Sequence, residues 1–103
     1  MSAARREIVH VVVRGRVQGV GYRAFVEDEA VRLGIDGWVR NRRDGASVEA
    51  LFAGSEHAVR AMVERCREGP MGARIDDIVQ REGTPQELAQ RGQGLAFAVL
   101  PTG

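Results

Sequence analysis

The sequence predicts an α+β fold in which two helices cover one face of an antiparallel sheet. Runs rich in β-branched residues alternate with two segments whose apolar residues recur at helical spacing. Glycine, proline or Asp-Gly pairs separate these segments. The length of 103 residues suits one domain with its own hydrophobic core and is too short for two.

Residues 8–14 predict the first strand, because valines occupy every second position. His10 lies between these valines, so we expect it on the open face of the sheet. A turn with three glycines follows, and residues 22–33 then predict the first helix, since their apolar side chains form one stripe. Glu27 and Asp28 fall off this stripe and are most simply solvated helix charges.

The second half of the chain begins with a hairpin. Residues 35–41 predict the second strand and residues 47–53 the third, joined by a polar turn at 42–46 that contains Asp-Gly. Ser55 is expected to cap a second helix, whose apolar side chains again form one stripe. Gly69-Pro70 ends that helix.

Residues 73–82 predict the fourth strand, and residues 95–100 predict a short extra strand near the C-terminal end. Residues 83–94 contain Gly, Pro and Gln without a clear period, so we expect a loop there. The element order is therefore β-α-β-β-α-β plus a terminal strand. This is the ferredoxin-like arrangement, with strand order 4-1-3-2 and both helices on one face.

The turn between the first strand and the first helix predicts an anion-binding site. Gly15, Gly19 and Gly21 let the backbone curl until several N–H groups point at one spot. The helix N-terminus adds unpaired donors and a partial positive charge, and Arg23 adds a planar fork of donors. The spacing matches neither a Walker A loop nor a dinucleotide fingerprint. An ordinary tight turn with a solvated arginine is the alternative interpretation.

The predicted topology brings a second polar side chain to the same edge of the sheet. The first and second strands run parallel with the third between them, so their C-terminal ends meet there. Asn41 closes the second strand and should lie about 10 Å from the 15–21 loop, which is two inter-strand spacings. Asn41 shares strand parity with Val39, so we expect both to face the helices. Arg23 and Asn41 can then reach one phosphate-sized group.

These residues resemble those of the acylphosphatases, small ferredoxin-like hydrolases of carboxylic–phosphoric anhydrides. The resemblance covers about residues 7–100. It is carried by residues 15–23, Gly-Arg-Val-Gln-Gly-Val-Gly-Tyr-Arg, and by residues 37–41, Gly-Trp-Val-Arg-Asn. Asp44-Gly45 and Val48-Glu49 support it.

The resemblance implies that Arg23 binds the phosphate of an acyl phosphate and that Asn41 orients the attacking water. It also implies a phosphate-binding loop made of Arg16, Val17, Gln18, Gly19, Val20, Gly21 and Tyr22. The substrate would be a small-molecule acyl phosphate, with inorganic phosphate or sulfate as product or inhibitor, and no metal or cofactor is expected. Tyr22 replaces the usual Phe, and the turn after Asp44 is one residue longer than usual.

Composition argues against several other classes of protein. Fifteen basic and fourteen acidic residues give a formal charge of +1, and aromatic residues are few, so nucleic-acid binding is not expected. No apolar run approaches a membrane span, and the start of the chain lacks the apolar stretch of a signal peptide. The single cysteine suits a reducing compartment. We therefore expect a cytoplasmic monomer.

We expect one domain over residues 1–103, with its core in about 7–100 and a disordered tail at 1–6. Two alternative functions remain at this point. The chain could be a non-enzymatic ferredoxin-like module that binds RNA or a partner protein through its open sheet face. It could also be a variant specific for carbamoyl phosphate. The cations available for an RNA face are Arg14, Arg40, Arg42 and Arg43.

Overall fold

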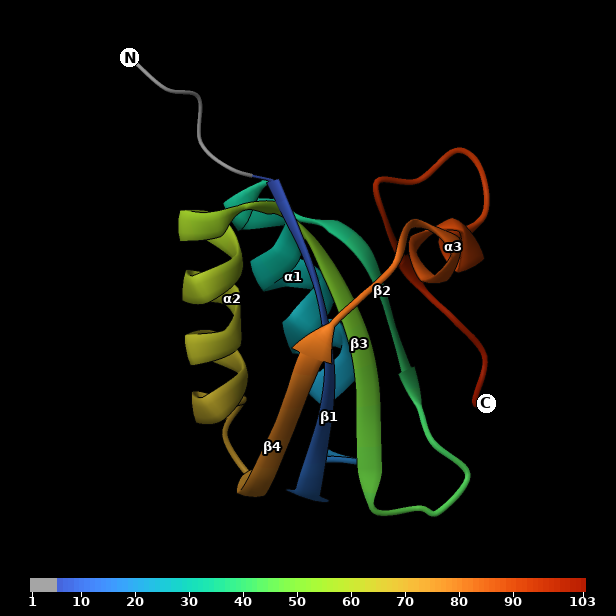
Figure 1. Ribbon diagram of the computed structural model, residues 1–103. Coiled ribbons are helices and arrows are strands. Elements are labelled where there is room, and N and C mark those ends of the chain that lie inside the picture. Colours follow the sequence, from blue (N-terminus) through green and yellow to red (C-terminus); the bar gives the residue numbers. More distant parts are fainter. Residues whose placement is uncertain (1–5) are drawn as a thin grey trace.

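The computed structural model of the protein describes residues 6–103, so almost all of the expected tail lies outside the described residues. Figure 1 shows the arrangement of the elements. They are β1 Arg6–Arg16, α1 Tyr22–Leu33, β2 Asp36–Asn41, β3 Ser47–Ser55, α2 Glu56–Glu68, β4 Arg74–Glu82, α3 Pro85–Leu88, the 3-10 helix η1 Ala89–Arg91 and β5 Phe97–Val99.

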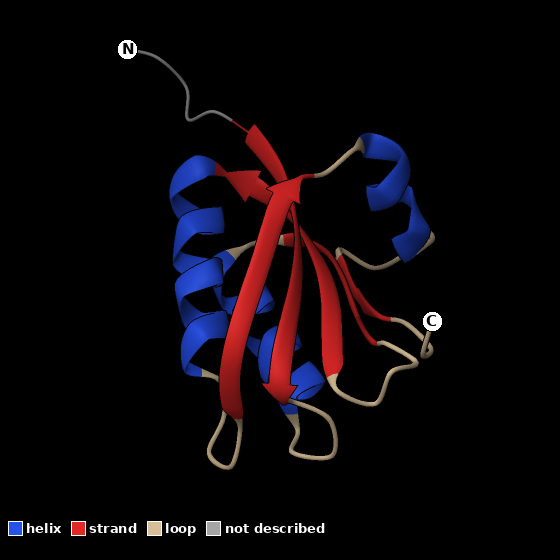
Figure 2. Ribbon diagram, turned by 60° about the horizontal axis from the view of Figure 1, so that its bottom comes forward, coloured by secondary structure: helices blue, strands red, loops and turns tan. Residues whose placement is uncertain are grey.

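The strands form one sheet in the order β4-β1-β3-β2-β5, which confirms the predicted ferredoxin-like order with an added C-terminal strand. The pairs β4–β1, β1–β3 and β3–β2 are antiparallel, whereas β5 lies parallel to β2. The sheet is therefore mixed, which the sequence did not predict. Figures 1 and 2 show α1 and α2 together on one side of the sheet and α3 apart from them.

The main core lies between the sheet and the two long helices. The predicted stripes are confirmed, because alternate residues of β1 and β3 and one face of each helix are buried there. The free thiol of Cys66 is fully buried in this core, as expected for a packing residue. The buried side chains of this core include Val11, Val13, Val17, Tyr22, Val26, Ile35, Val39, Val48, Phe52, Val59, Met62, Val63, Cys66 and Phe97.

An irregularity in β4 lets two isoleucines share this core. Ile75 and Ile78 both pack against it, although residues three apart in a regular strand face opposite sides. The β1–β4 register shifts just before Gly15, which pairs with Ile75, while Val13 pairs with Ile78. A Cβ on Gly15 would lie 2.1 Å from the carbonyl oxygen of Arg74, so this close approach requires glycine.

The expected loop over residues 83–94 is wrong in part, because it contains α3 and η1. Thr84 Oγ1 accepts from the Glu87 backbone N–H (3.1 Å), and the Glu87 carboxylate accepts from the Thr84 backbone N–H (3.0 Å). This is a capping box, and Pro85 occupies the first helical position. A helix of four residues is too short to show a hydrophobic period, which is why periodicity missed it.

The sheet face opposite α1 and α2 is also less open than predicted. Trp38, Leu51 and Ala98 are buried on it, and Leu88 of α3 packs against them. The prediction that His10 lies on an open face is wrong, because this residue is only 6% exposed. The ring of His10 bonds to Glu49 and lies edge-on to Trp38, and α3 packs on the same face.

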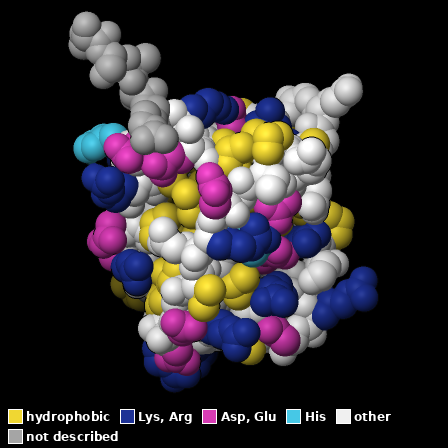
Figure 3. Space-filling model, in the orientation of Figure 1, with side chains coloured by type: hydrophobic (Ala, Val, Ile, Leu, Met, Phe, Trp, Pro, Cys, Tyr) yellow, Lys and Arg dark blue, Asp and Glu magenta, His cyan; other side chains and the backbone are white. Residues whose placement is uncertain are grey.

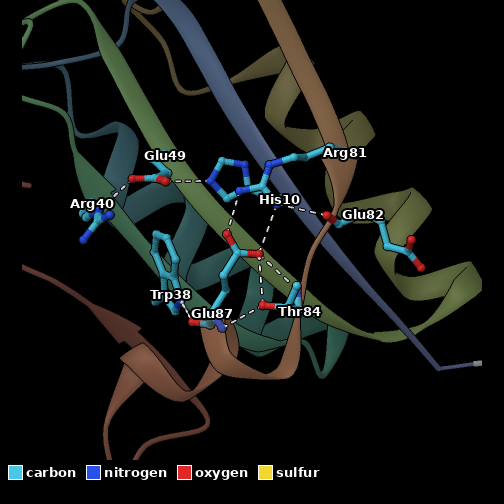
Figure 4. A network of polar contacts seen from close by, with 8 residues as sticks. All are labelled: His10, Trp38, Arg40, Glu49, Arg81, Glu82, Thr84 and Glu87. Carbon is cyan, nitrogen blue, oxygen red and sulfur yellow. Dashed lines mark hydrogen bonds and ion pairs between the residues drawn. The ribbon is translucent and has the colours of Figure 1, made fainter.

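A polar network joins α3 to this face (Figure 4). His10 Nε2 donates to Glu49 Oε2 (2.6 Å), and Glu49 Oε1 accepts from Arg40 Nε (2.8 Å). The indole Nε1–H of Trp38 donates to the carbonyl oxygen of Glu87 (2.7 Å). The bond from Trp38 holds α3 on this face, and the other two join neighbouring strands beside it.

The structure predicts a stabilising role for the hydroxyl that distinguishes Tyr22 from Phe. Tyr22 Oη donates to the carbonyl oxygen of Cys66 (2.7 Å) and links α1 to α2 inside the core. We expect Tyr22→Phe to lower the free energy of unfolding by about 1 kcal/mol, the usual net contribution of one buried hydrogen bond. Urea unfolding of both proteins measures the difference, and equal or greater stability of the variant would be inconsistent with this role.

The docking of α3 should weaken in acid. The Arg81 guanidinium, bonded to the carboxylate of Glu87 at 2.6 Å, lowers the pKa of Glu87 to about 2. Because this folded-state pKa lies below the ordinary value of 4.5, its stabilising contribution is complete above pH 4.5 and is lost as pH falls toward 2. Glu87→Gln should therefore lose less stability than wild type between these pH values. Urea unfolding at several pH values, monitored by the fluorescence of Trp38, the only tryptophan, measures the free energy of unfolding of both proteins. Equal losses of stability in the two proteins would refute this prediction.

Candidate active site

Strand β3 brings the ends of β1 and β2 together, as the topology predicted. Val48 of β3 pairs with Val13 of β1 on one side and with Asn41 of β2 on the other. These three residues form one row across the sheet, and neighbours in such a row face the same side. Val13 and Val48 both lie in the core beneath the helices. Asn41 therefore faces the helical side, two strand spacings or about 10 Å from β1.

The loop between β1 and α1 leaves the helix N-terminus without a side-chain cap. Gly21, at φ 80°, lies in the left-handed region and directly precedes α1. It has no side chain to bond the first turn, which also contains no acidic residue. By contrast, Ser55 caps α2 and Thr84 caps α3. The first N–H groups of α1 are therefore available to an anion.

A pocket of about 490 Å³ lies where this loop, α1 and the ends of β2 and β5 meet. Arg23 and Asn41 both line it, so the structure brings together the two side chains that the sequence singled out. The full lining consists of Val17, Gly19, Gly21, Tyr22, Arg23, Ala24, Glu27, Asn41 and Val99.

The two central side chains both have unused bonding capacity. Arg23 makes no ion pair with any carboxylate of residues 6–103. Asn41 Oδ1 is buried and accepts no hydrogen bond from the part of the chain that the structure describes. A buried amide oxygen without a donor costs about 1–3 kcal/mol. A water or ligand in the pocket would remove that cost.

Three residues of the expected phosphate loop do not line the pocket. Arg16 is the exposed last residue of β1. Val20 packs against the main core. Gln18 turns its side chain toward the β2–β3 hairpin, where Nε2 donates to the carbonyl oxygens of Arg42 (2.8 Å) and Ser47 (2.9 Å). These three residues are therefore not part of the pocket lining.

The hairpin that Gln18 contacts is itself closed by Asp44. Its carboxylate accepts from the Ser47 hydroxyl (2.6 Å) and from the Ala46 backbone N–H (2.8 Å). These bonds, chiefly that of the Ser47 hydroxyl, lower the pKa of Asp44. The backbone N–H of Gly15 also donates to the Ala46 carbonyl oxygen (3.2 Å). The turn at residues 42–46, which is one residue longer than usual, is thus held by hydrogen bonds and supports the 15–21 loop.

Three lining residues, Ala24, Glu27 and Val99, were not among the predicted site residues. Glu27 was expected to be a solvated helix charge, yet it lines the pocket one turn beyond Arg23. The i, i+4 spacing of Arg23 and Glu27 was the available signal. Val99 lines the pocket from β5, and no sequence pattern indicated that β5 would pair parallel to β2.

The surface offers little support for an RNA-binding face. Figure 3 shows basic and acidic side chains intermixed on the side it displays. Arg40, one of the cations considered for such a face, is bound to Glu49 and its guanidinium lies 4.9 Å from the centroid of the Trp38 ring. Within residues 6–103, no helix is long and apolar enough to cross a bilayer.

Comparison with known proteins agrees with the geometry. The acylphosphatase family model matches residues 9–91. An acylphosphatase of Bradyrhizobium diazoefficiens is 55% identical over 97 residues, which cover 94% of this chain and 97% of that protein.

Solved structures show the same relationship. An acylphosphatase from Bacillus subtilis superposes with a TM-score of 0.78 at 34% identity and covers 93% of this chain and 99% of its own. One from Coxiella burnetii gives a TM-score of 0.80 at 27% identity, covering 97% and 100%. The protein therefore belongs to the acylphosphatase family, whose members are enzymes that hydrolyse acyl phosphates.

Proposed function

We propose that the pocket hydrolyses an acyl phosphate by direct attack of a water on phosphorus. The main-chain N–H groups of the 16–22 loop, together with Arg23, hold the phosphate group, and Asn41 orients the water. The observation that carries this proposal is the buried, unpartnered Oδ1 of Asn41 in the same pocket as the Arg23 guanidinium. That oxygen can accept a hydrogen bond only from something that enters the pocket.

The chemistry required of these groups is limited. The leaving group of an acyl phosphate is a carboxylate, which departs without a strong acid. The water oxygen forms a bond to phosphorus while the bond from phosphorus to the acyl oxygen breaks, and the carboxylate keeps that electron pair. One proton of the water stays on the product phosphate and the other passes to solvent. What remains for the protein is positioning and stabilisation of charge on the equatorial oxygens.

Each group suits its proposed task. Loop amides and a guanidinium are hydrogen-bond donors that are in place before the reaction, so they can stabilise the charge of the phosphate oxygens in the transition state. The planar fork of Arg23 matches two phosphate oxygens at once. Asn41 carries no charge, so its amide can hold a water beside the phosphate without the repulsion that a carboxylate would exert.

We also propose that the chain works as one cytoplasmic domain and as a monomer, with inorganic phosphate or sulfate as product or inhibitor. Burial raises the pKa of the Cys66 thiol to about 12, so this cysteine remains protonated and unreactive, as suits a reducing compartment. The large apolar side chains exposed in residues 6–103 come from several separate elements, in contrast to the continuous patch of an obligate dimer. They are Val31, Met71, Val79, Leu95 and Val99.

The division of labour predicts different effects for the two central residues. Arg23→Ala should weaken phosphate binding and turnover together, whereas Asn41→Ala should lower kcat by about 10²–10³-fold with little change in inhibition by inorganic phosphate. Hydrolysis of benzoyl phosphate with phosphate as inhibitor measures both. Arg60→Ala removes a mostly exposed arginine of α2 and serves as the control. Wild-type rates in both pocket variants would contradict the assignment of Arg23 and Asn41 to the site.

The geometry of the guanidinium predicts that its charge alone is insufficient. Arg23→Lys keeps one positive charge but replaces the two-pronged donor with a single ammonium group. We expect kcat/KM for benzoyl phosphate to fall severely, by about 10²-fold or more. Recovery of more than half of the wild-type value would show that the site needs only a cation.

A further inference from the structure

We infer that the outer part of the pocket, formed by Ala24, Glu27 and Val99, binds the acyl group and selects acyl phosphates with an uncharged, apolar acyl chain over those with an anionic chain. This inference rests on the proposed function, because it assumes that the phosphate occupies the loop and Arg23. It assigns a role to two residues, Glu27 and Val99, that the reaction itself does not use.

The direction of the reaction places the acyl group at the mouth of the pocket. In an in-line displacement the leaving group departs on the side opposite the attacking water. Asn41 lines the pocket, and its Oδ1, which orients the water, is buried. Ala24 is exposed and Val99 is 41% exposed, so they lie at its outer rim. The acyl group therefore extends outward between α1 and β5.

The pocket is also larger than a phosphate group requires. Its volume of about 490 Å³ lies within the range of roughly 300–1,000 Å³ that small-molecule sites occupy, whereas a phosphate group has five heavy atoms. Glu27 follows Arg23 by four residues, which places it about 6 Å further along the helix axis. This distance is suited to the far end of a small acyl chain whose phosphate is bound at Arg23.

The carboxylate of Glu27 sets the charge preference. Like Arg23, it makes no ion pair with the residues that the structure describes. An anionic group on the acyl chain would approach it with like charge, and at moderate salt we expect this repulsion to lower kcat/KM by about 3- to 10-fold. A neutral acyl chain experiences no such repulsion.

Val99 sets the preference for apolar chains. It is one of few large apolar side chains in residues 6–103 that are substantially exposed, and it faces the pocket from β5. An apolar acyl chain that covers it removes both surfaces from water. The parallel pairing of Val99 with Val39 fixes this side chain next to the end of β2. A short acyl group such as acetyl gains less from this contact than a ring does.

Matched substrates test the charge preference. The value of kcat/KM is measured for 4-carboxybenzoyl phosphate and for 4-carbamoylbenzoyl phosphate, which has nearly the same shape without the charge. We expect wild type to prefer the amide, and Glu27→Gln to reduce that preference by about 3- to 10-fold. Added salt should reduce the preference in wild type and have less effect in the variant. Asp28→Asn removes the neighbouring exposed charge, which lies off the pocket, and should leave the preference as in wild type.

A second pair of substrates tests the apolar contact. Val99→Thr exchanges a methyl for a hydroxyl at almost constant volume and should lower the ratio of kcat/KM for benzoyl over acetyl phosphate by about threefold or more. Val79→Thr changes an exposed valine of β4, outside the pocket, and should keep the wild-type ratio.

The outcomes separate this inference from the proposed function. Unchanged ratios in Glu27→Gln and Val99→Thr, with acetyl phosphate still hydrolysed, would overturn the inference and leave the function in place. An equal loss on every substrate in Glu27→Gln would also overturn it, because Glu27 would then act in the reaction itself. Failure of the wild-type protein to hydrolyse any acyl phosphate would instead contradict the proposed function.

Discussion

The site depends on one constraint, the position of β3 between β1 and β2. Because β3 is antiparallel to both neighbours, β1 and β2 end at the same edge of the sheet. Val48 fixes the register on both sides, with Val13 on one strand and Asn41 on the other. A slip of one residue in β2 would turn Asn41 to the opposite face, away from α1 and Arg23. The hydrophobic core that sets this register therefore also aligns the two polar groups of the pocket.

Polar contacts then fix the parts of the site that the core does not reach. The 15–21 loop is exposed at Gly19 and Gly21, yet Gln18 and the backbone of Gly15 bond it to the β2–β3 hairpin. Asp44 closes that hairpin through its carboxylate. The loop is thereby held in one shape before a ligand arrives, and less conformational entropy is lost on binding. On the other side of the sheet, α3 and the His10–Glu49 pair cover a face that carries no residue of the pocket.

Much of this arrangement could be predicted from the sequence, since local patterns determine it. The valine alternation of β1 and the stripe of α1 follow from periodicity, and the predicted bounds of α1, Tyr22 to Leu33, agree with the structure. Other features depend on contacts distant in sequence. The four-residue helix α3 has no period, the parallel pairing of β5 has no local signal, and the burial of His10 depends on Glu49 of β3 and Trp38 of β2. Glu27 was expected to be only a solvated charge; it lines a pocket to which β5 contributes Val99, a contact distant in sequence.

The central claim is that loop amides and Arg23 hold a phosphate while Asn41 holds a water. A crystal structure of the protein with bound inorganic phosphate tests it most directly. We predict phosphate oxygens within about 2.7–3.2 Å of the loop N–H groups and of the Arg23 guanidinium, with Asn41 Oδ1 accepting from an adjacent water. Phosphate bound only outside this pocket, or Asn41 Oδ1 bonded to the protein instead of to water, would contradict the account.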